Sequence, residues 1–115
     1  MSLLELDDAE IIRIAEPMMD EVMLGLAHRD YRAMSQQFSV DLKSVLSDDT
    51  FQNMLAEQRH WGRPGARELI AIFRKPKAFT LVWNQYFEAA EGDIMAIATI
   101  ALKGGRYFID DFQLH

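Results

Sequence analysis

The last third of the chain, from Phe79 to Leu114, most constrains what this sequence can fold into. It is rich in aromatic and β-branched residues, and two turn signals, Glu91-Gly92-Asp93 and Gly104-Gly105, divide it into three segments of strand length. The middle segment, Ile94 to Lys103, is apolar on both sides of the pleat. A sheet built around such a strand needs a covering layer on each face.

A fourth strand and a set of helices are expected upstream of this run. The segment Glu68 to Arg74 holds a run of consecutive apolar residues and predicts a short strand. Before it, apolar residues recur at steps of three and four, and Asp or Ser stands where helix caps are expected. The expected helices cover residues 8–27, residues 31–37, a short piece after Ser39, and a segment that starts at Asp48 and ends before Gly62. Helices followed by antiparallel strands predict an α+β fold with four strands, in a single domain of residues 1–115.

Pro17 interrupts the first helical pattern. Proline removes one backbone donor and crowds the carbonyl of Arg13, so it kinks or splits a helix. The apolar face continues in phase across it, which favours one kinked helix. The alternative is two helices, the second starting with Pro17 at its first position.

The Gly104-Gly105 hairpin sets the register of the last two strands and so sorts side chains by face. The resulting pairs are Ile100 with Ile109, Thr99 with Asp110 and Ala98 with Asp111. The more apolar face, expected to take the helices, carries Leu81, Trp83, Gln85, Phe87, Ile94, Ala96, Ala98, Ile100, Leu102, Tyr107, Ile109 and Asp111. The two alanines are small and leave a hollow there. The expected pocket residues are Phe38, Trp61, Trp83, Ala96, Ala98 and Tyr107, although aromatic residues of a small domain are more often plain core.

The opposite face of the sheet is also apolar. It is expected to carry Val82, Tyr86, Met95, Ile97, Phe108 and Phe112. That is more contiguous apolar surface than a monomer leaves exposed, and the N-terminal helices can cover only one face. We therefore expect a homodimer, with a second copy on this face across a two-fold axis.

Charge and composition exclude several function classes. The chain of 115 residues has a net charge of −6, so nucleic acid is not an expected partner. The local basic cluster Arg63, Arg67, Arg74, Lys75 and Lys77 is expected to be a solvated loop and strand edge. There is no cysteine, hence no disulfide and no thiolate metal site. Acids directly follow Leu4, unlike a signal peptide, and no apolar run is long enough to span a membrane, so a cytoplasmic protein is expected.

One carboxylate stands out as a candidate for chemistry. Asp111 falls on the expected pocket face, where an apolar setting would raise its pKa and suit it to general acid or base catalysis. A one-residue register error would put Asp110 there instead. The simpler role for Asp111 is a hydrated strand end or a pair with Arg106. The three histidines are widely spaced and no carboxylate completes a ligand set, so no metal and no cofactor are expected.

This organisation resembles the nuclear transport factor 2-like superfamily, also called SnoaL-like or ketosteroid-isomerase-like. The resemblance rests on the helices-then-strands order, the length, and the helix junction Gly25-Leu26-Ala27-His28-Arg29-Asp30-Tyr31. It implies a curved sheet that wraps a long helix in a cone (a cystatin-like fold), a pocket inside the cone, and dimers through the outer sheet face. It does not extend to the ketosteroid isomerase catalytic set, because the strand around Leu69 to Phe73 holds no acid to act as base.

Two functions therefore remain open at the level of sequence. The first is a small dimeric module that binds an apolar ligand or a partner protein. The second is an isomerase- or dehydratase-type enzyme that uses Asp111 as acid or base. An enclosed pocket with Asp111 pointing into it would favour the enzyme.

Overall fold

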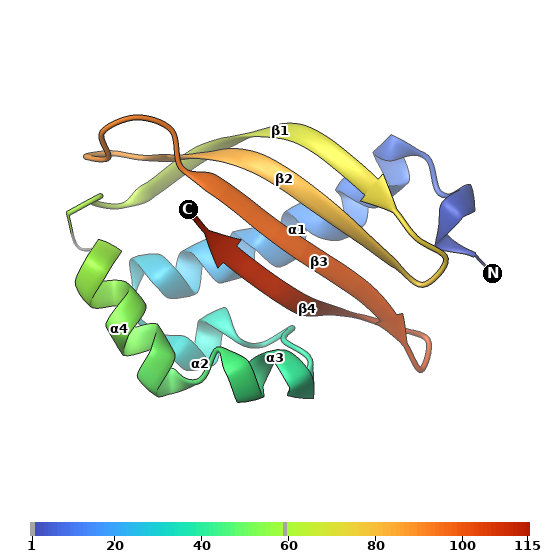
Figure 1. Ribbon diagram of the computed structural model, residues 1–115, viewed down its shortest axis with the longest axis horizontal. Coiled ribbons are helices and arrows are strands. Elements are labelled where there is room, and N and C mark those ends of the chain that lie inside the picture. Colours follow the sequence, from blue (N-terminus) through green and yellow to red (C-terminus); the bar gives the residue numbers. More distant parts are fainter. Residues whose placement is uncertain (1, 59) are drawn as a thin grey trace.

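The computed structural model, which describes residues 2–58 and 60–115, has helices packed on one side of a four-stranded antiparallel sheet (Figure 1). The strands follow one another in chain order, β1-β2-β3-β4, so every connection is a hairpin. The sheet curves over the long first helix, and the shorter helices lie near its β4 edge (Figure 1). The α+β prediction, with the helices before the sheet, is confirmed. No helix within the described residues is both long and apolar enough to cross a membrane.

Helix α1 is the longest element, and α2 and α3 are short. A 3-10 turn, η1, precedes the first α-helix. The bounds are η1 Leu3–Glu5, α1 Asp8–Ala27, α2 Tyr31–Met34, α3 Val40–Val45, α4 Asp48–Gln58, β1 Pro64–Arg74, β2 Ala78–Phe87, β3 Met95–Lys103 and β4 Arg106–Leu114.

Helix α1 is a single helix with Pro17 inside it, which excludes the split into two helices. A capping box closes its start: the Asp7 side chain accepts from the Glu10 N–H at 2.8 Å, and Glu10 accepts from the Asp7 N–H at 3.2 Å. Pro17 lies on the exposed side of the helix. A carbonyl that loses its partner there can bond to water, which lowers the cost of proline in a helix.

Strand β1 begins four residues earlier than expected. Pro64 and Gly65 suggest a loop, yet Pro64 pairs with Phe87, and Arg67 pairs with Gln85 across a register shift. An edge strand tolerates proline, and a bulge accommodates the extra residue. The buried amide of Gln85 supports this bulge, because its Nε2 donates to the carbonyls of Gly65 at 3.0 Å and Ala66 at 3.3 Å.

The predicted hairpin register holds from the turn as far as the pair Ile100 and Ile109. Both turn glycines have positive φ, 59° and 77°, as a two-residue turn with matching twist requires. Beyond this point β4 has a bulge, and Asp111 rather than Asp110 pairs with Thr99. The predicted pairing of Ala98 with Asp111 is therefore wrong by one residue.

That slip exchanges the faces of two side chains. Phe112, expected on the outer face, pairs with Ala98 and is only 4% exposed in the core. Asp111, expected on the inner face, pairs with Thr99, whose hydroxyl lies 2.8 Å from that of Thr80. The rest of the inner face is as predicted.

The two alanines of β3 are packing positions. Ala98 stands between Leu81 on β2 and Phe112 on β4, and all three side chains are buried in the core. Ala96 stands beside the fully buried Trp83. Small residues in the central strand thus make room for large neighbours on both sides.

The outer sheet face carries the other five residues predicted for it: Val82, Tyr86, Met95, Ile97 and Phe108. Tyr86 is 60% exposed, and strand β1 adds Ile70 and Phe73 at 58% and 59%. No described helix covers this face (Figure 1).

Candidate functional site

The two aspartates of β4 lie away from any inner pocket. Asp111 accepts a hydrogen bond from the Gln113 side chain at 2.8 Å on the half-exposed outer side. Asp110 occupies the bulge, where one oxygen accepts from Lys103 Nζ at 2.8 Å and from Ser39 Oγ at 2.7 Å. The hydrogen bond from Lys103, and then that from Ser39, lowers the pKa of Asp110. The same bond raises the pKa of Lys103.

Asp110 therefore has a structural role. Ser39 is the N-cap of α3 and accepts from the Leu42 N–H at 3.1 Å while donating to Asp110. The carboxylate thus links the start of α3 to the sheet edge.

The predicted pocket aromatics belong to the core or its margin. Phe38 and Trp83 are buried. Trp61 packs on Phe87 with ring centroids 5.2 Å apart, and Tyr107 packs on Phe79 at 6.1 Å. These residues, together with the two β3 alanines, do not come together around one cavity.

A polar cluster that no local sequence pattern indicates lies between α1 and the sheet. Glu16 accepts from Trp83 Nε1 at 2.8 Å with one oxygen and from Arg67 Nε at 2.9 Å with the other. Arg67 also donates to Asp20 at 2.5 Å, and its side chain is 10% exposed. The expectation that Arg67 is solvated is wrong. Both Glu16 oxygens accept hydrogen bonds, and the cluster joins α1 to β1 and β2.

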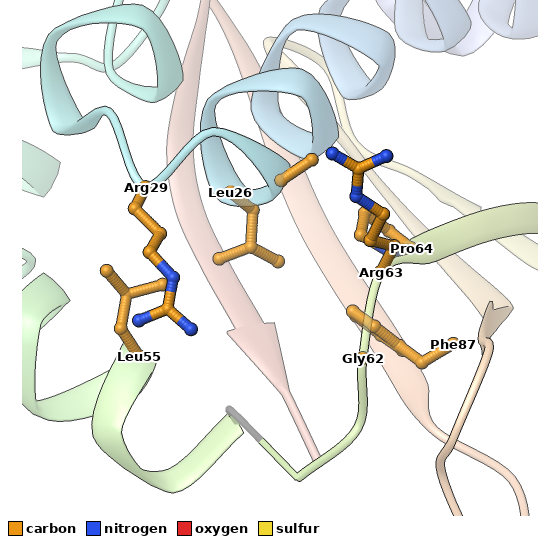
Figure 2. A pocket seen from close by; sticks show the side chains of 8 residues that line it. Leu26, Arg29, Leu55, Gly62, Arg63, Pro64 and Phe87 are labelled. Carbon is orange, nitrogen blue, oxygen red and sulfur yellow. The ribbon is translucent and has the colours of Figure 1, made fainter.

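One open site is a cavity of about 220 Å³. It lies between the end of α1, the helix α4 and the start of β1 (Figure 2). We call it the mouth pocket. Its lining residues are Leu26, Ala27, Arg29, Leu55, Gly62, Arg63, Pro64 and Phe87. Leu26, Leu55 and Phe87 are buried core residues, so their faces toward the pocket are apolar.

Two arginines border the mouth pocket. Figure 2 shows the Arg29 guanidinium beside Leu55 and the Arg63 guanidinium on the other side of the opening. Neither forms an ion pair with an acid in residues 2–58 or 60–115. Guanidinium groups bind carboxylate or phosphate oxygens in a planar, bidentate geometry.

The end of helix α1 fixes the backbone conformation of Arg29. The Asp30 N–H donates to the Gly25 carbonyl at 2.8 Å and the Arg29 N–H to the Leu26 carbonyl at 3.2 Å, which together form a Schellman motif. This motif places Arg29 at φ 55°, a left-handed conformation that glycine or asparagine usually takes. Within the described residues, every other residue with a positive φ is a glycine.

Arg63 is fixed at its backbone. Its N–H donates to the Glu88 carboxylate at 3.1 Å, and its carbonyl accepts from the Glu88 N–H at 2.9 Å. Gly62 precedes it at φ 75°, and a Cβ there would lie 2.4 Å from Glu88 Cγ. The positive φ and this close contact favour glycine at position 62, and the Arg63 side chain runs beside the end of α1 (Figure 2).

The chemistry available in the mouth pocket is binding. Its eight lining residues, all within the described chain, include no carboxylate, imidazole or hydroxyl that could transfer a proton. No three potential metal ligands come together anywhere in the described part of the chain. The sequence does hold one clue to this site, an arginine at the position after the helix where glycine is common.

Comparison with protein-family models and with curated proteins finds no match to this chain.

Proposed function

We propose that this domain binds a small molecule with an apolar body and one anionic group, most simply a carboxylate, in the mouth pocket. The observation that carries the proposal is the combination of an apolar floor, Leu26, Leu55 and Phe87, with two arginine side chains that form no ion pair with a described acid. A pocket that combines an apolar part with a small number of polar groups is typical of small-molecule sites. The left-handed Arg29 adds support, because backbone strain concentrates at functional sites.

The size of the cavity limits the ligand. At about 220 Å³ it exceeds the ~150 Å³ cavity that binds benzene, but it is smaller than most drug-sized sites. A short-chain or single-ring carboxylic acid is the expected class.

We also propose that the chain belongs to the nuclear transport factor 2-like superfamily and forms a homodimer through the outer sheet face. The helices-first curved sheet supports the first, and the exposed Ile70, Phe73 and Tyr86 support the second. The enzyme alternative has no such support, because Asp111 faces away from the inner side of the sheet.

The test is calorimetric binding of phenylacetate and of its neutral analogue phenylacetamide. Because the arginines contact only the anion, the acid is expected to bind at least ~10-fold more tightly than the amide. Arg29→Gln and Arg63→Gln each reduce that preference. Arg13→Gln changes the net charge by the same amount, but Arg13 is exposed on α1 outside the pocket. This variant is expected to keep the full preference for the acid over the amide.

Equal binding of acid and amide, or an equal loss in Arg13→Gln, would show that the arginines do not recognise the ligand. No binding of either compound at millimolar concentration would overturn the proposal for this ligand class.

A further inference from the structure

Strand β4 forms one edge of the sheet, and only part of that edge is covered. Near its middle, the Ile109 N–H donates to the Gln37 carbonyl at 2.7 Å, and the Ser39 N–H donates to the Ile109 carbonyl at 2.9 Å. Phe38 thus forms a parallel bridge to Ile109. The segment before α3 acts as a short extra strand along this part of β4.

The direction of the backbone groups further along β4 follows from the pairing. Met95 and His115 exchange both backbone hydrogen bonds, each at 2.9 Å. In an antiparallel ladder such pairs alternate with pairs that form no hydrogen bonds, so Gln113 and Asp111 also bond to β3. The backbone groups of Phe112 and Leu114 therefore point away from β3, toward the open edge.

These outward groups have no partner in the described chain. No hydrogen bond within residues 2–58 and 60–115 reaches the N–H or carbonyl of Phe112 or Leu114 outside the strand ladder. Backbone donors and acceptors almost always find partners, so these groups bond to water or to an incoming backbone. The open edge is only three residues long.

A groove of about 400 Å³ lies beside the end of this edge. Helix α4 contributes Thr50, Asn53, Met54 and Glu57, and Trp61, Leu114 and His115 complete the lining. The half-buried Met54 and Trp61 give it an apolar part, and Glu57 is an exposed acid at its wall. A groove that combines unpaired strand groups with an apolar pocket is the arrangement used in strand addition.

We propose that the edge from Phe112 to Leu114 and this groove bind a short extended segment of a partner protein, which adds to the sheet as a fifth strand. The segment carries apolar side chains for Met54 and Trp61 and a basic residue for Glu57. A second copy of this chain fits less well. Pairing over three residues buries far less than the roughly 800 Å² per partner of a stable dimer.

The first test is amide hydrogen exchange in the free protein, followed by NMR. The amides of Phe112 and Leu114 are expected to exchange at least ~10-fold faster than those of Asp111 and Gln113, which bond to β3. Equal protection of all four amides would mean that the edge is already covered, which would overturn the proposal.

The second test uses a capped hexapeptide of alternating valine and lysine as the probe. Its addition is expected to slow exchange at Phe112 and Leu114. N-methylation of alternate peptide amides, which removes donors and leaves side chains intact, is expected to weaken binding by at least ~10-fold. The same peptide with glutamate in place of lysine binds more weakly, and Glu57→Lys reverses this preference.

A matched pair of variants then tests the edge itself. Leu114→Pro removes an N–H that forms no bond to β3, so the fold tolerates it as an edge proline. Leu114→Ala loses the same side chain but keeps the donor. The peptide is expected to bind Leu114→Ala and not Leu114→Pro. Equal binding by the two variants, equal binding of the methylated peptide, or no binding of the valine–lysine peptide at millimolar concentration each refutes strand addition.

Discussion

Replacement of Arg29 by glycine separates the stability of the domain from its proposed function. Arg29 lies at φ 55° at the end of α1. The left-handed conformation costs an L-residue about 1–2 kcal/mol, and glycine avoids this cost. Glycine also gains about 0.4–1 kcal/mol of extra freedom in the unfolded chain, which offsets part of the benefit. The Arg29→Gly protein is therefore expected to be more stable by about 0.5–1 kcal/mol, a rise in Tm of about 2–4 °C.

The assay is thermal unfolding with and without phenylacetate. Without ligand, Arg29→Gly melts above the wild type. With ligand, the Tm of Arg29→Gly rises less than that of the wild type, because the guanidinium that contacts the carboxylate is gone. Arg29→Ala serves as the control, since it removes the same guanidinium but keeps a Cβ in the left-handed conformation.

Arg29→Gly is expected to be more stable than Arg29→Ala, and both variants are expected to lose the same part of the ligand-induced rise in Tm. If the glycine variant is less stable than the alanine variant, the strain at this position is not real. If both variants keep the full ligand effect, Arg29 does not contact the ligand.

Three further substitutions test the packing and the polar link at β4. Gly25→Ala would place a Cβ 2.4 Å from the backbone nitrogen of Met34, and since backbone cannot yield cheaply, a loss of about 3 kcal/mol is expected in urea unfolding. Phe112→Ala is expected to lose about 3–5 kcal/mol, as a core residue does, whereas a loss below about 1 kcal/mol would place Phe112 on the outer face. Asp110 has a lowered pKa, so its contribution to stability is present above its unfolded pKa near ~3.9 and is lost as the pH falls through the folded pKa. Asp110→Asn therefore removes part of the acid-dependent loss of stability, and an unchanged pH profile would contradict the ion pair.

Local signals predicted most of the fold. The Gly104-Gly105 turn determines the pairing of its nearest neighbours, because a two-residue hairpin allows one register. Caps at Asp7, Ser39 and Asp30 marked helix starts that the structure confirms. These features depend on residues close together in the chain.

Features that depend on distant contacts were not predictable. The start of β1 at Pro64 relies on pairing with Phe87 and on the Gln85 amide, neither of which has a local signal. The mouth pocket brings Arg29 and Arg63 together from segments that are far apart in the chain. From the sequence alone, an arginine that borders a pocket cannot be distinguished from an ordinary solvated surface arginine.

The bulge in β4 accounts both for the wrong register predicted beyond Ile109 and for the open edge of the sheet. One extra residue, Asp110, stands outside the regular ladder and reverses the faces of everything after it. Phe112 then fills the space beside Ala98, and Asp111 moves to the outer side. The bulge also shifts the alternation of hydrogen bonds, so the outward positions are Ile109 before it and Phe112 after it. Without the bulge, Asp111 and Gln113 would face outward at the edge, and two acceptor-rich side chains would border it. With it, the outward backbone groups belong to Phe112 and Leu114, and Leu114 lines the groove, where an added strand gains both hydrogen bonds and apolar contacts.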